Sequence, residues 1–221
     1  HEHLLIDTEG FHHPPESAGA RDFYYRPLTL ELTGRIRHYH EPTADDNRLL
    51  DVDTAIEEVN LYKQHGGDSL VDATSIGLLR DPAGLARISR ATGVNVVMGA
   101  SYYIAATHPE DMDARTEDEI VEHILRDVTE GADGTGVRSG VIGEIGCSWP
   151  LRDNERKVLR ASGRAQRATG APILIHPGRD ESAPLEIINL LREAGADPGH
   201  IVMGHLDRTV FDRAVLKRIA D

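Results

Sequence analysis

Short apolar runs alternate along the chain with amphipathic stretches of helical spacing. The runs are almost continuous in Val, Ile, Leu and Met, which is typical of strands that are covered on both faces. The stretches between them begin at capping residues and end near glycine, which predicts helices. The predicted strands are Ser69–Thr74, Val94–Ala100, Gly140–Ile145, Pro172–His176 and Ile201–His205. The predicted helices are Asp53–His65, Pro82–Thr92, Glu117–Glu130, Asn154–Thr169, Ala183–Ala194 and Phe211–Ala220.

Alternating strands and helices with this spacing predict βαβ units and a parallel sheet, either a barrel or an open doubly wound sheet. The glycine-rich patterns G-x-G-x-x-G and G-x-x-x-x-G-K-[ST] are absent from the sequence. The nucleotide-binding forms of the open sheet are therefore less favoured.

Residues 8–50 contain no clear periodic pattern and are predicted to be one long irregular segment. A connection of this length inside a compact domain is usually functional or mobile. We interpret 8–50 as a flap over the mouth of a site, and a solvated surface excursion is the alternative. The chain as a whole, residues 1–221, is predicted to be a single domain.

Charge and composition exclude several classes of partner. The formal net charge is −13 over 221 residues, whereas nucleic acids and anionic membranes are bound by basic faces. No apolar run is long enough to cross a bilayer, and His1–Asp7 has no signal-peptide pattern. The single cysteine, Cys147, fits a reducing compartment and a small buried residue better than a nucleophile. We expect a cytoplasmic protein.

The candidate chemistry lies where predicted strands end. Three successive apolar strands end at or near Glu144, His176 and His205, the layout of a (β/α)₈ barrel with its site at the carboxyl ends of the strands. An H-x-H pair, His1 and His3, places two imidazoles on one face of an extended chain. A second H-x-H at positions 38–40 has the same spacing, and only the strand-end pattern favours the first.

This donor set predicts a metal site. Imidazole and carboxylate without thiolate suit Zn²⁺, Mn²⁺, Fe²⁺ or Co²⁺. Five donors exceed what one catalytic ion with an open position uses, so they predict two ions. One ion would take His1 and His3, the other His176 and His205, with Glu144 between them. The count of βα units is about six, the first incomplete, whereas a barrel has eight.

Four segments carry a resemblance to a known family. The runs Gly143–Pro150, Ile175–Arg179 and Gly204–Arg208, together with His1–Leu4, resemble the phosphotriesterase family of the amidohydrolase superfamily, most closely its phosphotriesterase-related branch. The resemblance implies a (β/α)₈ barrel, here truncated to about six units, with a binuclear centre that usually holds zinc. It also implies that Glu144 replaces the carboxylated lysine of other branches. The family's eighth-strand aspartate, a ligand and proton acceptor, is expected beyond Asp221.

Several other residues near the predicted ligands each have two possible roles. Tyr103 occupies the place where related lactonases have a tyrosine near the metals, and it is either an oxyanion donor or an aromatic wall. Arg179 either contacts an anionic substrate group or pairs with a carboxylate at the barrel rim. Asp207 and Arg208 either orient the ligands or pair with one another. We do not expect ligand roles for His12, His13, His38, His40 or His108.

These observations predict a metal-dependent hydrolase whose metal-bridging hydroxide attacks a carbonyl or phosphoryl ester, lactone or amide, with carbonyl substrates favoured. A ligand-binding protein on the same barrel is the first alternative, and a mononuclear amidohydrolase or isomerase is another. The expected partner is a small molecule, and Arg179 and Arg208 favour an acidic one. The family resemblance implies a homodimer. No nucleic-acid or membrane partner is expected.

Overall fold

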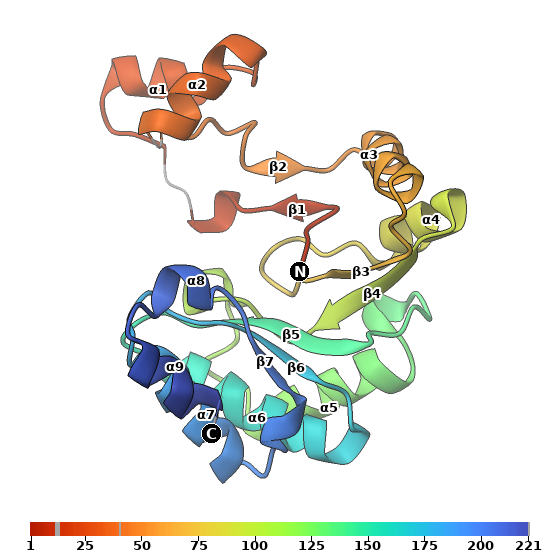
Figure 1. Cartoon of the computed structure of the whole chain (residues 1–221), viewed down its shortest axis with the longest axis vertical. Helices are drawn as coiled ribbons and strands as arrows, with labels where there is room; N and C mark the ends of the chain where they lie inside the picture. Colours follow the sequence, from red (N-terminus) through yellow and green to blue (C-terminus); the bar gives the residue numbers. More distant parts are fainter. Residues whose placement is uncertain (12–13, 40, 221) are drawn as a thin grey trace.

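A five-stranded parallel sheet forms the centre of the molecule in the computed structural model, which describes residues 1–11, 14–39 and 41–220. Neighbouring strands follow one another in sequence order, and the sheet curls into an open arc (Figure 1). This order and curvature are those of a (β/α)₈ barrel rather than of a doubly wound sheet. The strands are β3 (Ser69–Asp72), β4 (Asn95–Ala100), β5 (Val141–Gly146), β6 (Ile173–His176) and β7 (Ile201–Met203).

Helices connect the strands, and their starts follow the capping signals in the sequence. The side chain of Asp51 accepts from Thr54 N, and Thr116 forms a capping box with Glu119. The predicted helices are confirmed to within two residues at each end. They are α3 (Val52–Gln64), α4 (Pro82–Thr92), α5 (Glu117–Thr129), α6 (Asp153–Thr169), α7 (Ala183–Glu193) and α9 (Arg213–Ala220). Short helical turns are α8 (Leu206–Thr209), η2 (Ala105–Thr107), η3 (Ala132–Gly134) and η4 (Pro198–His200).

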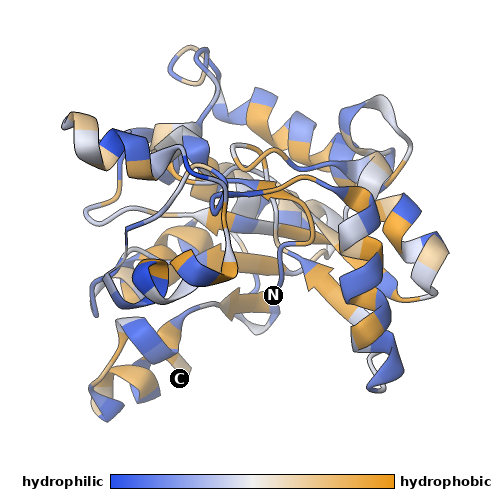
Figure 2. Ribbon diagram, turned by 90° about the horizontal axis from the view of Figure 1, so that it is seen from above, coloured by the Kyte–Doolittle hydropathy of each residue, from blue (hydrophilic) through white to orange (hydrophobic). Residues whose placement is uncertain are grey.

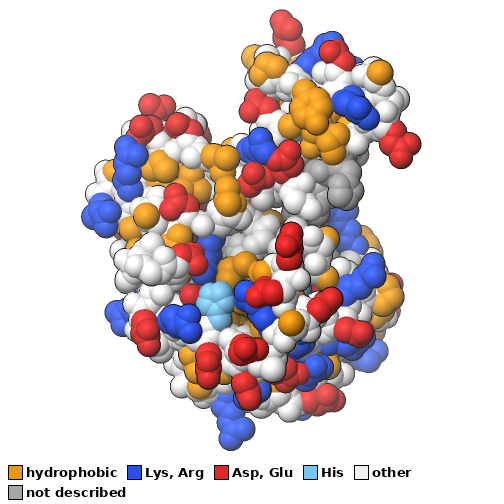
Figure 3. All heavy atoms as spheres, turned by 180° about the vertical axis from the view of Figure 1, so that it is seen from behind, with side chains coloured by type: hydrophobic (Ala, Val, Ile, Leu, Met, Phe, Trp, Pro, Cys, Tyr) orange, Lys and Arg blue, Asp and Glu red, His pale blue; other side chains and the backbone are white. Residues whose placement is uncertain are grey.

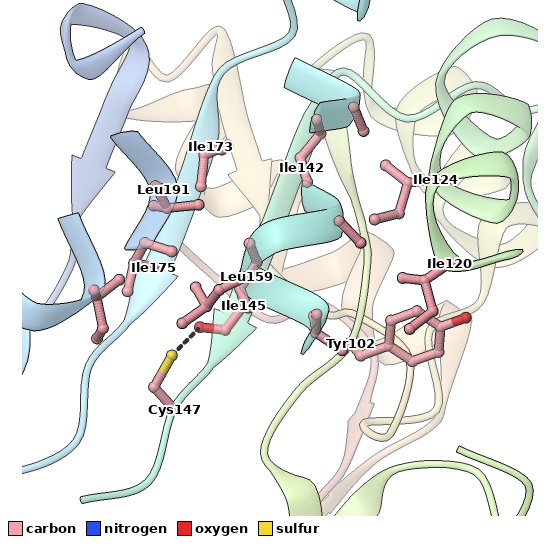
Figure 4. Packing of buried hydrophobic residues seen from close by; sticks show 14 of the residues in the cluster. Tyr102, Ile120, Ile124, Ile142, Ile145, Cys147, Leu159, Ile173, Ile175 and Leu191 are labelled. Carbon is pink, nitrogen blue, oxygen red and sulfur yellow. Dashed lines mark hydrogen bonds between the residues drawn. The ribbon is translucent and has the colours of Figure 1, made fainter. Parts of the chain in front are cut away.

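The main core lies between the sheet and helices α5, α6 and α7 (Figure 4). Ile142, Ile173 and Ile175 on the strands and Leu159 and Leu191 on the helices are all fully buried. Figure 2 shows the apolar residues gathered along the strands and on the inner faces of the helices. Burial of this apolar surface fixes the helices against the sheet and so fixes the carboxyl ends of the strands.

The first residues of the chain add a sixth position to the arc. Glu2 forms a parallel bridge with Asp72, and its N–H donates to the carbonyl of Val71. His1 and His3 therefore stand beside the carboxyl end of β3. The predicted α/β fold with a barrel-type arrangement of about six units is confirmed.

Residues 8–50 differ from the prediction. They contain two helices, α1 (Ala18–Tyr24) and α2 (Leu30–Tyr39), and β2 (Arg48–Leu49), which pairs antiparallel with β1 (Ile6–Asp7). The short turn η1 (Glu9–Phe11) follows β1. Helix α2 has no buried residue. The predicted irregular segment is therefore wrong, while the flap role of 8–50 and the single-domain assignment stay predictions.

The last predicted strand is also too long. Strand β7 ends at Met203, and His205 adopts a left-handed conformation with φ of +54° directly before α8. None of the described helices is long and apolar enough to cross a membrane.

Candidate metal centre

Four imidazoles surround one buried carboxylate at the carboxyl ends of the strands. Glu144 is only 1% exposed. Its Oε2 lies 2.8 Å from Nε2 of His1, 3.1 Å from Nδ1 of His176 and 3.7 Å from Nε2 of His205. Its Oε1 lies 3.4 Å from Nε2 of His3. The structure thus brings together all five predicted ligands, which come from separate parts of the sequence.

The parallel sheet explains this convergence. Glu144 lies near the end of β5 and His176 ends β6, where Gly146 and His176 are paired in register. Carboxyl ends of neighbouring parallel strands meet at one edge, so side chains there face a shared space. The left-handed turn at His205, just after β7, directs its imidazole into the same space.

The orientation of His3 is set by a hydrogen-bond chain. The hydroxyl of Thr74 donates to the carbonyl of Leu5 at 3.1 Å and lies 3.0 Å from Nδ1 of His3. Since the hydroxyl has one proton, it accepts from Nδ1–H, and neutral His3 then carries no proton on Nε2. The Nε2 lone pair therefore faces a carboxylate oxygen of Glu144. Two acceptors facing each other are unfavourable unless a proton or a metal cation lies between them.

A second observation also fits a bound cation. The Nε2 atom of His205 is buried and has no hydrogen-bond partner. Donor atoms of His1, Glu144 and His205 lie within 4.8 Å of one another. Buried polar atoms are normally satisfied, so an unpaired imidazole nitrogen beside a carboxylate fits a ligand position. The predicted division of the ligands between two ions stays a prediction.

The electrostatics of the centre keep Glu144 ionised. Burial would raise the pKa of Glu144, but the hydrogen bonds from His1 and His176 outweigh burial and hold the pKa well below its usual range. The hydrogen bond to Glu144 raises the pKa of His1. Burial lowers the pKa of His205 to about 4, and the charges of His176 and Arg208 act in the same direction. At neutral pH this places a carboxylate next to a neutral His205.

Two polar side chains contact the cluster, and the charge of a third, Arg179, acts on Tyr103. The hydroxyl of Tyr103 lies 3.3 Å from Nδ1 of His176, and burial, with the charge of Glu144, raises the pKa of Tyr103. Arg208 lies 3.1 Å from Nε2 of His176 through one guanidinium nitrogen. Arg179 is exposed, and within the described residues it forms no ion pair. Neither the rim ion pair of Arg179 nor a pair between Asp207 and Arg208 is present among those residues.

Supporting residues were not identified from the sequence. Asp72, fully buried at the end of β3, accepts from the backbone of Leu4 at 2.7 Å and of Thr74 at 3.0 Å. It thereby holds the segment that carries His3. Ser75 donates to the carbonyl of Glu144 at 2.8 Å. Asp72 could have been identified from the sequence, because β3 is another apolar strand that ends in a carboxylate.

A second buried carboxylate joins the loops that follow β4 and β5. Glu155 on α6 accepts from Ala105 N at 2.9 Å and from Ser148 N and Oγ at 3.0 and 2.7 Å. It also accepts from Arg152 N at 2.9 Å. Because Ala105 closely follows Tyr103, these bonds fix the position of the Tyr103 loop against the β5 loop. The thiol of Cys147, next to Ser148, is buried, which raises its pKa and agrees with a packing role.

The other candidate histidines lie elsewhere. His38 is exposed on α2 and contacts Tyr39. His108 places Nε2 2.8 Å from the carbonyl of Tyr103, to which it donates. Positions 12, 13 and 40 lie outside the described residues. Acidic and basic side chains intermingle on the face shown in Figure 3 rather than forming one basic patch.

Comparison with known proteins gives the family of this chain. The chain matches the family model described as the Phosphotriesterase family over residues 1–221, and it belongs to that family. It is 41% identical over 221 residues to an N-acetyltaurine hydrolase from Tetraodon nigroviridis, covering all of this chain and 63% of the relative. The chain thus spans less than two thirds of the length of such relatives.

Solved structures show the same relationship. The chain is similar to a resiniferatoxin-binding protein from Rhodobacter sphaeroides, with a TM-score of 0.94, 37% identity, and coverage of 100% of this chain and 62% of that one. It is also similar to a phosphotriesterase homology protein from Escherichia coli that was solved with phosphate in its active site. There the TM-score is 0.77, with 26% identity and coverage of 100% of this chain and 66% of that one.

Proposed function

We propose that this protein is a metal-dependent hydrolase of small molecules and that its preferred substrate is an N-acyl amide. The observation that carries the proposal is the convergence of four imidazoles, those of His1, His3, His176 and His205, on the buried carboxylate of Glu144. Family membership supports a hydrolase, and the name of the 41% identical relative supports an amide such as N-acetyltaurine. Hydrolysis of a carbonyl ester, a phosphoryl ester or a lactone would use the same metal-binding residues.

His1, His3, Glu144, His176 and His205 would hold the metal. The donor set fits two divalent ions, with zinc the first candidate and Glu144 as the shared ligand. Divalent ions in such a site lower the pKa of water and polarise the substrate's carbonyl oxygen. Hydrogen bonds to His3 and to the backbone around it keep this ligand set oriented before any ion is bound.

Tyr103 and Arg179 would act on the substrate. The pKa of Tyr103 is raised, so its hydroxyl keeps its proton and can donate to the oxygen that becomes negative during attack on the carbonyl. Arg179 is exposed at the edge and would attract an acidic substrate group. In amide hydrolysis water adds across the C–N bond, the acyl carbon gains the oxygen, and the nitrogen gains a proton and leaves as the amine.

The test uses the full-length protein loaded with zinc. Acetate release from N-acetyltaurine is measured by NMR, and bound metal by elemental analysis, for wild type and Glu144→Gln. We expect the variant to lose both metal and turnover, because the amide is a much weaker metal ligand. Glu122→Gln, an exposed carboxylate on α5, is the matched control and should change neither. Unchanged metal content and turnover in Glu144→Gln would contradict the proposal.

A binding protein on the same fold is the second candidate. The specific observation in its favour is the similarity, at 37% identity, to a structure named for resiniferatoxin binding. A protein that holds zinc, binds the amide and releases no acetate would support this candidate over the hydrolase.

A further inference from the structure

Arg208 lies directly against the histidine cluster. It belongs to the short turn α8, three residues after His205, and is half-buried. One guanidinium NH₂ group lies 3.1 Å from Nε2 of His176. Its Nε atom is fully enclosed and has no hydrogen-bond partner. The cationic head of Arg208 is therefore held at the site rather than extended into solvent.

Within the described residues, Arg208 has no acidic partner. The buried Arg80, by contrast, pairs with Asp127 at 2.7 Å and with Asp133 at 3.0 Å. The guanidinium fork matches carboxylates and other oxyanions through two parallel hydrogen bonds, and a single imidazole nitrogen leaves most of its donors unused. An arginine that borders the site without an acidic partner favours an anionic ligand.

The position of the ring proton on His176 links the contacts of Arg208 to metal binding at the centre. Nδ1 lies 3.1 Å from Oε2 of Glu144, while Nε2 faces Arg208. In the geometry described, Nε2 accepts from Arg208. A ligand role for Nδ1 would place the ring proton on Nε2, because a neutral imidazole carries one proton. Nε2 would then no longer accept, and the guanidinium would need another acceptor.

We propose that Arg208 recognises the acidic group of the substrate, so that this site selects N-acyl amides whose amine half ends in a sulfonate or carboxylate. The inference rests on the proposed function. Arg208 and Glu144 lie on opposite edges of the His176 ring. One imidazole ring therefore separates the anion contact from the metal centre. In N-acetyltaurine a two-carbon spacer separates the sulfonate from the amide nitrogen, so the anionic group lies close to the bond that is cleaved.

The test compares a charged and a neutral acetyl donor in the zinc-loaded full-length protein. N-acetyltaurine carries the sulfonate, and 4-nitrophenyl acetate carries no charge. We expect Arg208→Gln to lower kcat/KM at least tenfold more for N-acetyltaurine than for the ester, chiefly through KM. Arg208→Lys keeps the charge without the fork and should recover part of the loss. Arg192→Gln, an exposed arginine at the end of α7, removes the same charge elsewhere and should leave both substrates unchanged.

A binding measurement separates recognition from structural support. Ethanesulfonate is titrated into wild type and Arg208→Gln by calorimetry, with metal content measured in parallel. A tenfold or greater loss of affinity at unchanged metal content supports the assignment. Equal losses on both substrates with unchanged ethanesulfonate affinity would overturn it and make Arg208 a support for His176. If wild type hydrolyses neither substrate, the proposed function fails, and the ethanesulfonate affinities alone decide the role of Arg208.

Discussion

The hydroxyl of Thr74 determines which nitrogen of His3 faces the carboxylate. It lies 3.0 Å from Nδ1 of His3 while donating to the carbonyl of Leu5, so Nδ1 must carry the ring proton. Nε2 is then left with its lone pair toward Glu144. Partners of this kind hold a metal-binding histidine in the correct tautomer and rotamer.

Thr74→Val is expected to weaken metal binding. Valine keeps the shape of the side chain and removes the hydroxyl, so His3 loses its fixed tautomer. Affinity for zinc, measured by competition with a chromophoric chelator, should fall about 10- to 100-fold. Thr74→Ser keeps the hydroxyl and serves as the control. Equal zinc affinity in wild type and Thr74→Val would show that Thr74 does not orient His3.

Gly143→Ala is expected to destabilise the fold. Gly143 has φ of +133°, and a Cβ at this position would lie 2.1 Å from the carbonyl oxygen of Leu174. Backbone strain and overlap in a packed strand should together cost at least about 3 kcal/mol of unfolding free energy. Urea denaturation measures the loss. Gly19→Ala, in α1 with no atom near the added methyl group, should cause little change.

Arg80→Met is expected to leave a buried negative charge without its partner. The side chains of Arg80 and Asp127 are each 2% exposed and lie 2.7 Å apart. Breaking such a pair costs about 3–5 kcal/mol, mainly because the remaining ion stays buried. The double variant Arg80→Met/Asp127→Leu should lose less stability than Arg80→Met alone. A double variant that is less stable than both single variants would contradict this account.

The pH dependence of stability should include a contribution from His108. Burial lowers the pKa of His108 below 6.5, while its Nε2 donates to the Tyr103 carbonyl and its Nδ1 is buried without a partner. The unfolded chain therefore binds the proton more readily. This contribution is absent above about pH 6.5 and becomes destabilising as the pH falls below that value. His108→Gln should show a smaller loss of unfolding free energy between pH 7 and 5, and equal losses would refute the assignment.

Patterns local in the sequence predicted most of the parallel strands and the helices that connect them. The caps at Asp81 and Thr116 act within one helical turn, so the sequence alone locates these helix starts. The apolar strands could be recognised because both of their faces are covered. Helices α1 and α2 were missed because they are short and mostly exposed. The left-handed turn at His205 was missed because that conformation is rare outside glycine.

The five candidate ligands were predicted, but their surroundings were not. A strand-end histidine or glutamate is visible in the sequence because a polar residue there interrupts an apolar run. The role of Thr74 depends on a contact with His3, which is 71 positions away. Arg208 likewise reaches His176 across 32 positions. Such contacts depend on the register between strands, and residue type alone does not specify it.

The wide separation of the site residues has a consequence for the order of folding. His1 and Glu144 are 143 positions apart, and His205 follows β7, the last strand of the described sheet. A growing chain that lacks β7 can offer only part of the ligand set, and these long-range pairings form slowly compared with local helices. If these residues hold the metal as proposed, its stable capture would have to wait until β7 has joined the sheet. Bound metal would then indicate that the sheet has been assembled through β7.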